Sequence, residues 1–139
     1  TIQAQILDLL DRLKKETHMA ILLITHNLGI VAQYADNVAV MYAGKVVETA
    51  PVVELFSAPS HPYTRGLLNS VPQDDPSIPL KTIPGSVPHP AYLPEGCAFH
   101  PRCTEKLDKC MKKTPPLESI DSKKTHLTAC WLHESTLGA

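Results

Sequence analysis

The chain has 139 residues, of which 43% are hydrophobic, 19% charged and 5% aromatic, and 13 Lys and Arg nearly balance 14 Asp and Glu. A net charge of -1 gives no basic excess, so the composition excludes a general binder of nucleic acid or of acidic membranes. No apolar run approaches the roughly 20 residues that a membrane span needs. We therefore expect a soluble chain with room for one domain or two small ones.

Proline and cysteine are distributed unevenly. Twelve of the thirteen prolines lie between Pro59 and Pro116, and all four cysteines lie between Cys97 and Cys130. The chain therefore consists of two different parts that meet near Ser57. The first residues have no initiator methionine and no signal pattern, so we expect that the sequence begins inside a longer protein.

The first part reads as an α/β segment. Apolar residues recur at helical spacing over residues 2–16 and predict an amphipathic helix. A continuous apolar run at residues 19–25 predicts a buried strand of a mostly parallel sheet. His26 follows at the carboxyl end of this strand, where ligands bind in open α/β sheets, and is either a site residue or a hydrogen-bonded structural histidine.

The next elements are short. Asn27 predicts the N-cap of a helix over residues 28–35, and a hairpin follows with strands at 38–42 and 45–48 around Ala43 and Gly44. Pro51 predicts the start of a helix over 52–56. One buried strand and one hairpin cannot cover each other, so we expect most of the sheet before Thr1 or in another chain.

These residues carry a family resemblance. Residues 21–28 (ILLITHNL) resemble the switch-histidine segment of ATP-binding cassette (ABC) ATPases, and residues 38–48 resemble the hairpin that follows it. The resemblance implies that His26 contacts the γ-phosphate and helps to place the attacking water. It also implies ATP and Mg²⁺ as ligands of the complete subunit. The sequence contains no Gly-x-x-x-x-Gly-Lys-Ser/Thr loop, no Leu-Ser-Gly-Gly signature and no strand ending in Asp-Glu, so we expect no hydrolysis by this chain alone.

The second part begins with the run His-Pro-Tyr-Thr-Arg at residues 61–65 and predicts a helix over 62–70. A docked surface helix explains this run from physics alone. The run also resembles the C-terminal region of oligopeptide and dipeptide transporter ATPases, and this narrows the family to peptide importers and related nickel importers. Prolines over residues 71–94 predict an extended segment, either packed down through its apolar residues or disordered.

Four cysteines follow, separated by five, six and nineteen residues: Cys97, Cys103, Cys110 and Cys130. Disulfides require an oxidising compartment, which nothing in the sequence indicates. Structural zinc usually brings Cys-x-x-Cys pairs, which are absent, and an iron–sulfur cluster tolerates wider spacing. The spacing leaves zinc and a cluster open.

The sequence around these cysteines resembles the tail of peptide-transporter ATPases, which holds a 4Fe-4S cluster in some members. The resemblance implies a 4Fe-4S cluster on the four cysteines, with zinc as the alternative. Arg102 either offsets the charge of such a cluster or is an ordinary exposed arginine. Substitute ligands could come from three histidines: His100, His126 and His133.

The fold class expected is α/β, namely the C-terminal part of an ABC ATPase (P-loop NTPase) core at residues 1–57, followed by a proline-rich, loop-rich, metal-clamped extension at 58–139. The expected function is that of an ATPase subunit fragment in a peptide importer. Its partners would be a second ATPase subunit, membrane permeases and an extracytoplasmic peptide-binding protein, at the cytoplasmic face of the membrane and without nucleic acid. The alternative is a stand-alone metal-binding or interaction module with a decayed α/β half, which would fold as a monomer without the missing sheet.

Overall fold

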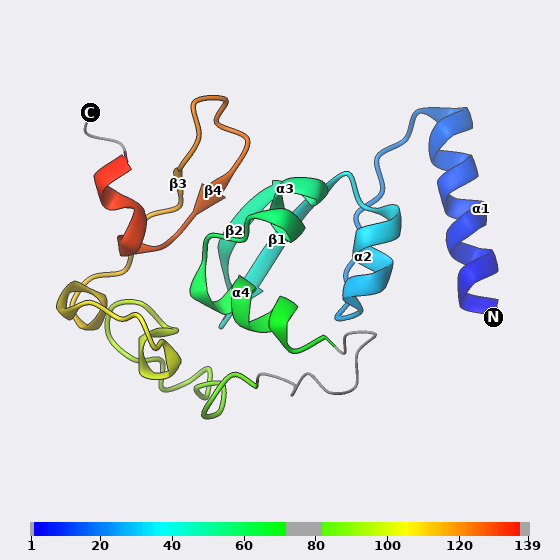
Figure 1. Cartoon of the computed structure of the whole chain (residues 1–139). Helices are drawn as coiled ribbons and strands as arrows, with labels where there is room; N and C mark the ends of the chain where they lie inside the picture. The colour runs from blue at the N-terminus through cyan, green and yellow to red at the C-terminus, as the bar shows by residue number, and fades with distance from the viewer. Residues whose placement is uncertain (1, 72–81, 137–139) are drawn as a thin grey trace, which may run out of the picture. The chain divides into compact units, whose positions relative to one another are not determined.

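A computed structural model of the chain describes residues 2–71 and 82–136 (Figure 1). The chain divides into two compact units, residues 1–36 and residues 37–139, and each is described by itself. Together the described residues form a small α/β structure with an antiparallel sheet. No helix within these residues has both the length and the apolar character needed to cross a membrane.

The first unit holds two helices, α1 (Ile2–Thr17) and α2 (Leu28–Tyr34). Asn27 caps α2, since its side-chain oxygen accepts hydrogen bonds from the amides of Gly29 and Ile30 at 3.0 and 3.3 Å. The Tyr34 hydroxyl donates to Asp8 on α1 at 2.7 Å. Both predicted helices and the predicted cap are confirmed.

The predicted strand at residues 19–25 is wrong for this structure. The segment between α1 and α2 has no regular secondary structure, and its apolar side chains are exposed, with Leu22 at 88% and Ile24 at 89%. A strand of a parallel sheet is stabilised by hydrogen bonds to its neighbours and by helices on both faces. No such neighbour pairs with this segment within the described residues, so the apolar run remains irregular.

The second unit is built on a hairpin of β1 (Asn37–Tyr42) and β2 (Lys45–Pro51), which pair antiparallel with Val40 opposite Glu48. Ala43 and Gly44 turn the chain with φ values of 48° and 79°. Two positive φ values are typical of the tight turn that matches the twist of a hairpin. The predicted hairpin is confirmed, and β2 runs three residues further than predicted.

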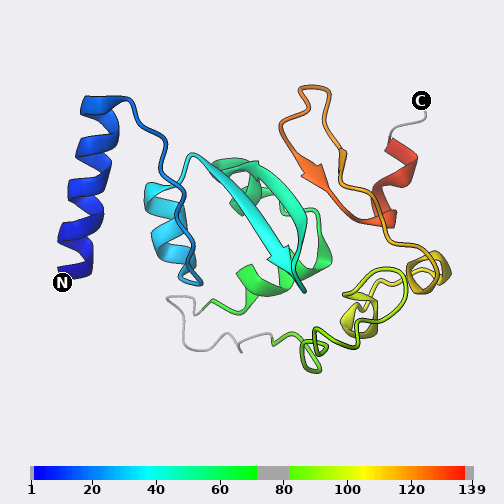
Figure 2. The ribbon, with the colours of Figure 1, turned by 180° about the vertical axis from the view of Figure 1, so that it is seen from behind.

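The C-terminal part of the chain completes the sheet. Two short strands, β3 (Glu118–Ser119) and β4 (Leu127–Thr128), pair with each other, and β4 pairs with β2 through Glu48 and Thr49. The strand order is therefore β1-β2-β4-β3 (Figure 2). Residues far apart in the sequence meet on strand β2.

Two helices follow the hairpin, α3 (Val52–Ser57) and α4 (Pro62–Asn69), close to the predicted bounds. His61 caps α4, since its Nδ1 accepts from the Tyr63 amide at 3.0 Å, and Pro62 occupies the first turn. The extension then forms three short 3-10 helices: η1 (His100–Arg102), η2 (Asp108–Met111) and η3 (Trp131–Thr136).

The core of this unit is a small aromatic cluster. The rings of Tyr42 and Phe99 pack edge to face with centroids 5.2 Å apart, and Tyr63 lies 4.7 Å from Tyr42 and 5.4 Å from Phe99. Val47 joins them as a buried residue. The hairpin, α4 and the cysteine-bearing extension therefore share one core.

The proline-rich segment is only partly packed. The prediction of an extended stretch over residues 71–94 lies in part outside the described residues, at 72–81. Residues 82–94 contain no helix or strand. Ile83 packs against α4 so closely that a Cβ added at Gly66 would lie 2.7 Å from its Cγ1, whereas Val87, Tyr92 and Leu93 are exposed. The prediction that apolar residues hold this segment down is therefore met at Ile83 and is wrong for the other three, while Ile78 and Leu80 lie outside the described residues.

Candidate metal centre

The four cysteines line one pocket. Its empty volume is about 300 Å³, and its walls also include the ring residues His61, Phe99 and Trp131. All four thiols are free, and Cys110 is buried while the other three are half-buried. The sequence prediction grouped these cysteines, and the structure brings them to the same place.

A glycine allows the first and third cysteines to approach. The Cys97 amide donates to the Cys110 carbonyl at 2.8 Å. Gly96, immediately before, has a φ of 74°, and an added Cβ would lie 2.3 Å from the same carbonyl oxygen. Real Cβ atoms do not approach oxygen so closely, so this close approach requires glycine.

Local turns orient the first three thiols. The Cys97 carbonyl accepts from the His100 amide at 3.0 Å and begins the turn that leads through η1 to Cys103. Phe99 inside this turn is 4% exposed and fixes the loop to the aromatic core. Cys110 lies on η2, where its sulfur accepts from the Leu107 amide at 3.4 Å.

The fourth thiol comes from a separate strand. Cys130 follows β4, and the preceding Ala129 amide donates to the Val47 carbonyl at 2.8 Å. On its other side, Trp131 donates from its indole nitrogen to the Lys113 carbonyl at 2.9 Å. The Lys109 ammonium lies 3.7 Å from the centre of the Trp131 ring, so the residues next to Cys110 and Cys130 contact each other.

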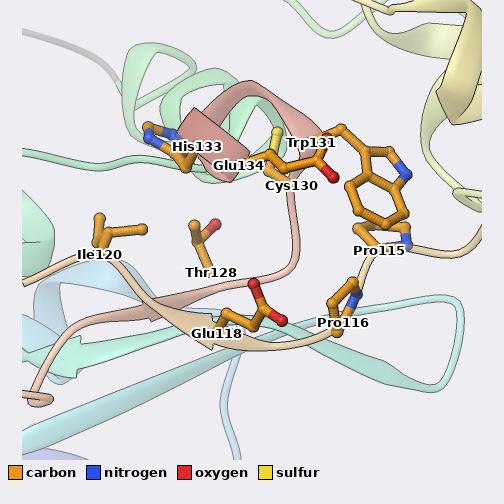
Figure 3. Close-up of a pocket in the computed structure, with 9 residues that line it drawn as sticks. All are labelled: Pro115, Pro116, Glu118, Ile120, Thr128, Cys130, Trp131, His133 and Glu134. Atoms are coloured by element: carbon orange, nitrogen blue, oxygen red, sulfur yellow. The ribbon is translucent and has the colours of Figure 1, made fainter. Parts of the chain in front are cut away.

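A second pocket borders the first and shares Pro115, Cys130 and Trp131 with it. Figure 3 shows Trp131 and Glu134 on the side of η3, across from Glu118 and Thr128 on the side of the short strands. The empty volume of this second pocket is about 250 Å³. Cys130 thus lies at the junction of the two pockets.

Burial makes three of the thiols weaker acids. It raises the pKa of Cys97 and of Cys103, and it raises the pKa of Cys130 to about 11, with a further contribution from the neighbouring cysteines in each case. Thiolates are the form that binds metals, so metal binding here would release protons and would be favoured by rising pH.

The described side chains do not form a compact site for a single metal ion. Across residues 2–71 and 82–136, no three His, Cys, Asp or Glu side chains are grouped closely enough to hold a single metal ion. The four cysteines line one pocket but form no metal site among the described side chains, and the 4Fe-4S cluster or zinc expected from the sequence stays a prediction.

The remaining predicted residues have other contacts. Arg102 is half-buried and donates to the carbonyls of Pro84 and Ile83 at 2.8 and 3.3 Å, so it fixes the proline-rich segment to η1. The histidines named as substitute ligands contact other groups: His100 lies by the Cys97 carbonyl, His126 by Glu48 and His133 by the Ser60 carbonyl. None of the three lines the four-cysteine pocket.

His26 lies in the first unit, exposed, in the bend just before α2. The Asn27 amide donates to the Thr25 hydroxyl at 3.0 Å and shapes this bend. An exposed imidazole at the start of a capped helix is accessible to a ligand. Its predicted role at a γ-phosphate stays a prediction.

The sequence analysis missed Glu48. This side chain on β2 is fully buried, and its carboxylate accepts from the amides of Ser60 and His61 at 2.7 and 2.9 Å and pairs with His126 Nε2 at 2.7 Å. Burial alone would raise its pKa, but these hydrogen bonds outweigh burial and hold the pKa below its ordinary value. The Thr64 hydroxyl also lowers this pKa, although its geometry falls short of a hydrogen bond. The signal in the sequence was a charged residue among the apolar residues of a strand.

An α/β segment with an exposed histidine, followed by a hairpin and a cysteine-bearing extension, is consistent with the C-terminal part of an ABC ATPase. Residues 47–110 match the family described as the oligopeptide/dipeptide transporter C-terminal region. The family predicted from the sequence is therefore confirmed. The match ends at Cys110, so it includes three of the four cysteines.

Three similar proteins carry names for peptide transport and ATP binding. The oligopeptide transport ATP-binding protein AppD of Bacillus subtilis is 50% identical over 135 residues, which cover 96% of this chain and 40% of that protein. A protein of Brucella melitensis named for peptide import and ATP binding is 50% identical over 137 residues, 94% of this chain and 40% of its own length. A protein of Brucella ovis with a name of the same kind is 51% identical over 128 residues, which cover 87% of this chain and 38% of that protein. The chain spans about two fifths of these relatives.

Proposed function

We propose that the chain is the C-terminal part of the ATPase subunit of a peptide importer, in which the complete subunit binds ATP and Mg²⁺ and couples hydrolysis to transport. Identity of about half over 94 to 96% of the chain supports this proposal. The alignment includes nearly all of the first half of the chain, and a decayed first half would not be expected to align at this identity. The domain boundary at residues 57 and 58 is part of this proposal.

In the complete importer, His26 would contact the γ-phosphate, where an imidazole N–H stabilises the charge that develops during phosphoryl transfer. The partners would be a second ATPase subunit, two permeases and an extracytoplasmic peptide-binding protein, at the cytoplasmic face of the membrane. This chain has no phosphate-binding loop in its sequence, so it supplies the histidine and the extension rather than the phosphate cradle.

A chimera tests this function. Residues 1–139 would replace the matching segment of the Bacillus subtilis protein, and the purified chimera would be assayed for ATP hydrolysis. We expect activity in the chimera and a loss of at least about tenfold in His26→Ala. His18→Asn, a change of another exposed histidine in the same unit, serves as the control and should retain activity. A chimera that hydrolyses ATP equally with and without His26 would exclude the proposed role.

We further propose that Cys97, Cys103, Cys110 and Cys130 hold a 4Fe-4S cluster, with zinc as the alternative. The common pocket of four thiols is the observation behind this proposal. When bound, the cluster would cross-link the extension, which has little regular structure and a small core. Cys97, Cys103 and Cys110 would hold it from one stretch of chain, and Cys130 would tie that stretch to the sheet.

Reconstitution without oxygen tests the cluster. Iron and sulfide should give an absorbance at about 400 nm in the unchanged chain, and Cys110→Ala should abolish it. Met111→Ala, a change of the exposed neighbouring residue, should leave it in place. A colourless protein with one equivalent of zinc and no iron would overturn the cluster in favour of zinc.

A further inference from the structure

The fourth cysteine depends on a weak element of structure. Cys130 follows β4, which has two residues and pairs with β2 through Glu48 with Thr128 and Thr49 with Leu127. The other three cysteines lie on one stretch of chain. Turns and the hydrogen bond between Cys97 and Cys110 hold this stretch together. Two ladder pairs alone are a small restraint on the path of a strand.

A buried carboxylate lies at this restraint. Glu48 has no exposed surface, and three groups point hydrogen-bonding nitrogen atoms at it: the Ser60 amide, the His61 amide and the His126 ring. His126, which is 5% exposed, is the only one of these donors that belongs to the C-terminal part of the chain. The pair spans 78 residues of sequence.

The partners of Glu48 lie close in sequence to residues of the four-cysteine pocket. His61 lines the pocket directly, and His126 precedes Cys130 by four residues. Between His126 and Cys130, the Ala129 amide donates to the Val47 carbonyl. The chain before Cys130 is therefore fixed to β2 at both Glu48 and Val47. The direction in which Cys130 leaves the sheet is thereby set by β2.

The opposite restraint on Cys130 is weaker. Trp131 and Lys109 contact each other where solvent reaches them, and Lys109 also pairs with the exposed Glu134. Ion pairs at the surface contribute little to stability, whereas a buried carboxylate that loses a donor is strongly penalised. We therefore expect the buried contact of Glu48 with His126 to restrain the path of Cys130 more than these surface contacts do.

We propose that Glu48 is a positioning residue of the four-cysteine site: through His126 it holds the strand that delivers Cys130 to the pocket. The proposal rests on the proposed metal site for its functional meaning. The arrangement of Cys130 in the metal-free chain can be measured without any metal, and this separates the two claims.

The test is the rate at which each cysteine of the metal-free chain reacts with N-ethylmaleimide, resolved by mass spectrometry. In His126→Leu, which removes the donor, Cys130 should react at least about tenfold faster, with the other three within about twofold of their original rates. His126→Gln keeps an N–H donor and should restore the slow reaction of Cys130. Glu48→Gln should resemble His126→Leu, and combining the two changes should add little, because both act on one contact.

Other results would overturn the positioning role. Unchanged reactivity of Cys130 in His126→Leu would mean that Trp131 and the strand pairs suffice. An equal increase at all four cysteines would mean that Glu48 supports the whole unit and not Cys130 in particular. Lys123→Ala, at the tip of the β3–β4 hairpin, is the matched surface control and should change none of the four rates.

A metal-loading arm distinguishes failure of this proposal from failure of the proposed site. Zinc and iron with sulfide would be added separately to the unchanged chain, to His126→Leu and to His126→Gln. Weaker binding by about tenfold in the Leu variant, with recovery in the Gln variant, supports the positioning role for a metal site. If the unchanged chain binds neither probe, the proposed metal site fails, while the labelling rates still decide whether Glu48 positions Cys130.

Discussion

The guanidinium of Arg102 lies against the ring of Tyr42, with 6.0 Å between its carbon and the ring centroid and 3.4 Å between Nη1 and the phenol oxygen. This contact joins η1, next to the second cysteine, to the last residue of β1. The same side chain binds the carbonyls of Ile83 and Pro84. One arginine therefore connects the hairpin, the proline-rich segment and the cysteine loop.

Arg102→Ala should lower the free energy of unfolding by about 1 to 2 kcal/mol, because two carbonyl acceptors and the Tyr42 contact lose their partner. Arg102→Lys should recover little of this loss, since an ammonium cannot donate in several directions from a flat group. Urea denaturation followed by circular dichroism would measure both. Lys112→Ala, an exposed change in the same extension, should have no effect, and an equal loss there would contradict the role of Arg102.

Gly96→Ala should destabilise the cysteine loop by about 2 to 4 kcal/mol, because it combines an unfavourable positive φ with a clash against the Cys110 carbonyl. Gly85→Ala provides a matched control. Gly85 has the same φ of 74°, but an added Cβ would meet only the Arg102 side chain at 3.5 Å. The control should therefore cost about 1 kcal/mol, from backbone strain alone. Equal losses of stability in the two variants would show that the close approach to Cys110 is unimportant.

Glu48 should make the protein sensitive to acid. Its pKa in the folded state lies below its ordinary value of 4.5, so as pH falls the carboxyl is protonated first in the unfolded chain. The contribution of Glu48 is therefore fully present above pH 4.5 and is lost as pH falls through the lower folded pKa. Urea midpoints measured from about pH 6 to about pH 3 should fall more steeply for the unchanged chain than for Glu48→Gln. Parallel curves would rule out this linkage.

The exposed apolar segment between α1 and α2 should make the isolated chain associate. Leu22 and Ile24 are almost fully exposed, and contiguous apolar surface of this kind promotes contacts between molecules. Sedimentation should show concentration-dependent association, and a double change of Leu22 and Ile24 to Lys should reduce it. Val53→Lys, at another exposed apolar position, is the control. A monomer at all concentrations would favour the alternative of a stand-alone module.

Local signals predicted the local elements well. Asn27 predicted the start of α2, Ala43 and Gly44 the hairpin turn, and Pro62 the first turn of α4, because each depends on the conformation of a few adjacent residues. The strand at residues 19–25 failed for the opposite reason. A buried parallel strand is defined by its neighbours in the sheet, and periodicity within the run does not supply them.

At the candidate site, too, features set by nearby residues were predictable and features set by distant strands were not. The grouping of the four cysteines followed from their number and from the family resemblance. The contact of Glu48 with His126 could not be predicted, because it depends on β2 and β4 meeting across most of the second unit. Gly96 carried a signal that was readable in principle, since a glycine directly before a cysteine suggests a tight approach of the backbone.

The pairing of β2 with β4 has a consequence for the order of folding. The two strands of the hairpin are adjacent in the sequence, whereas the contact of Tyr42 with Arg102 spans 60 residues and that of Glu48 with His126 spans 78 residues. Closing so long a loop costs more chain entropy than closing a hairpin, so this pairing forms late. On the ribosome, a chain that has not yet reached His126 can bring together three thiols but not the fourth. The pocket can therefore be complete only after the chain has been synthesised beyond Cys130 and β4 has paired with the hairpin.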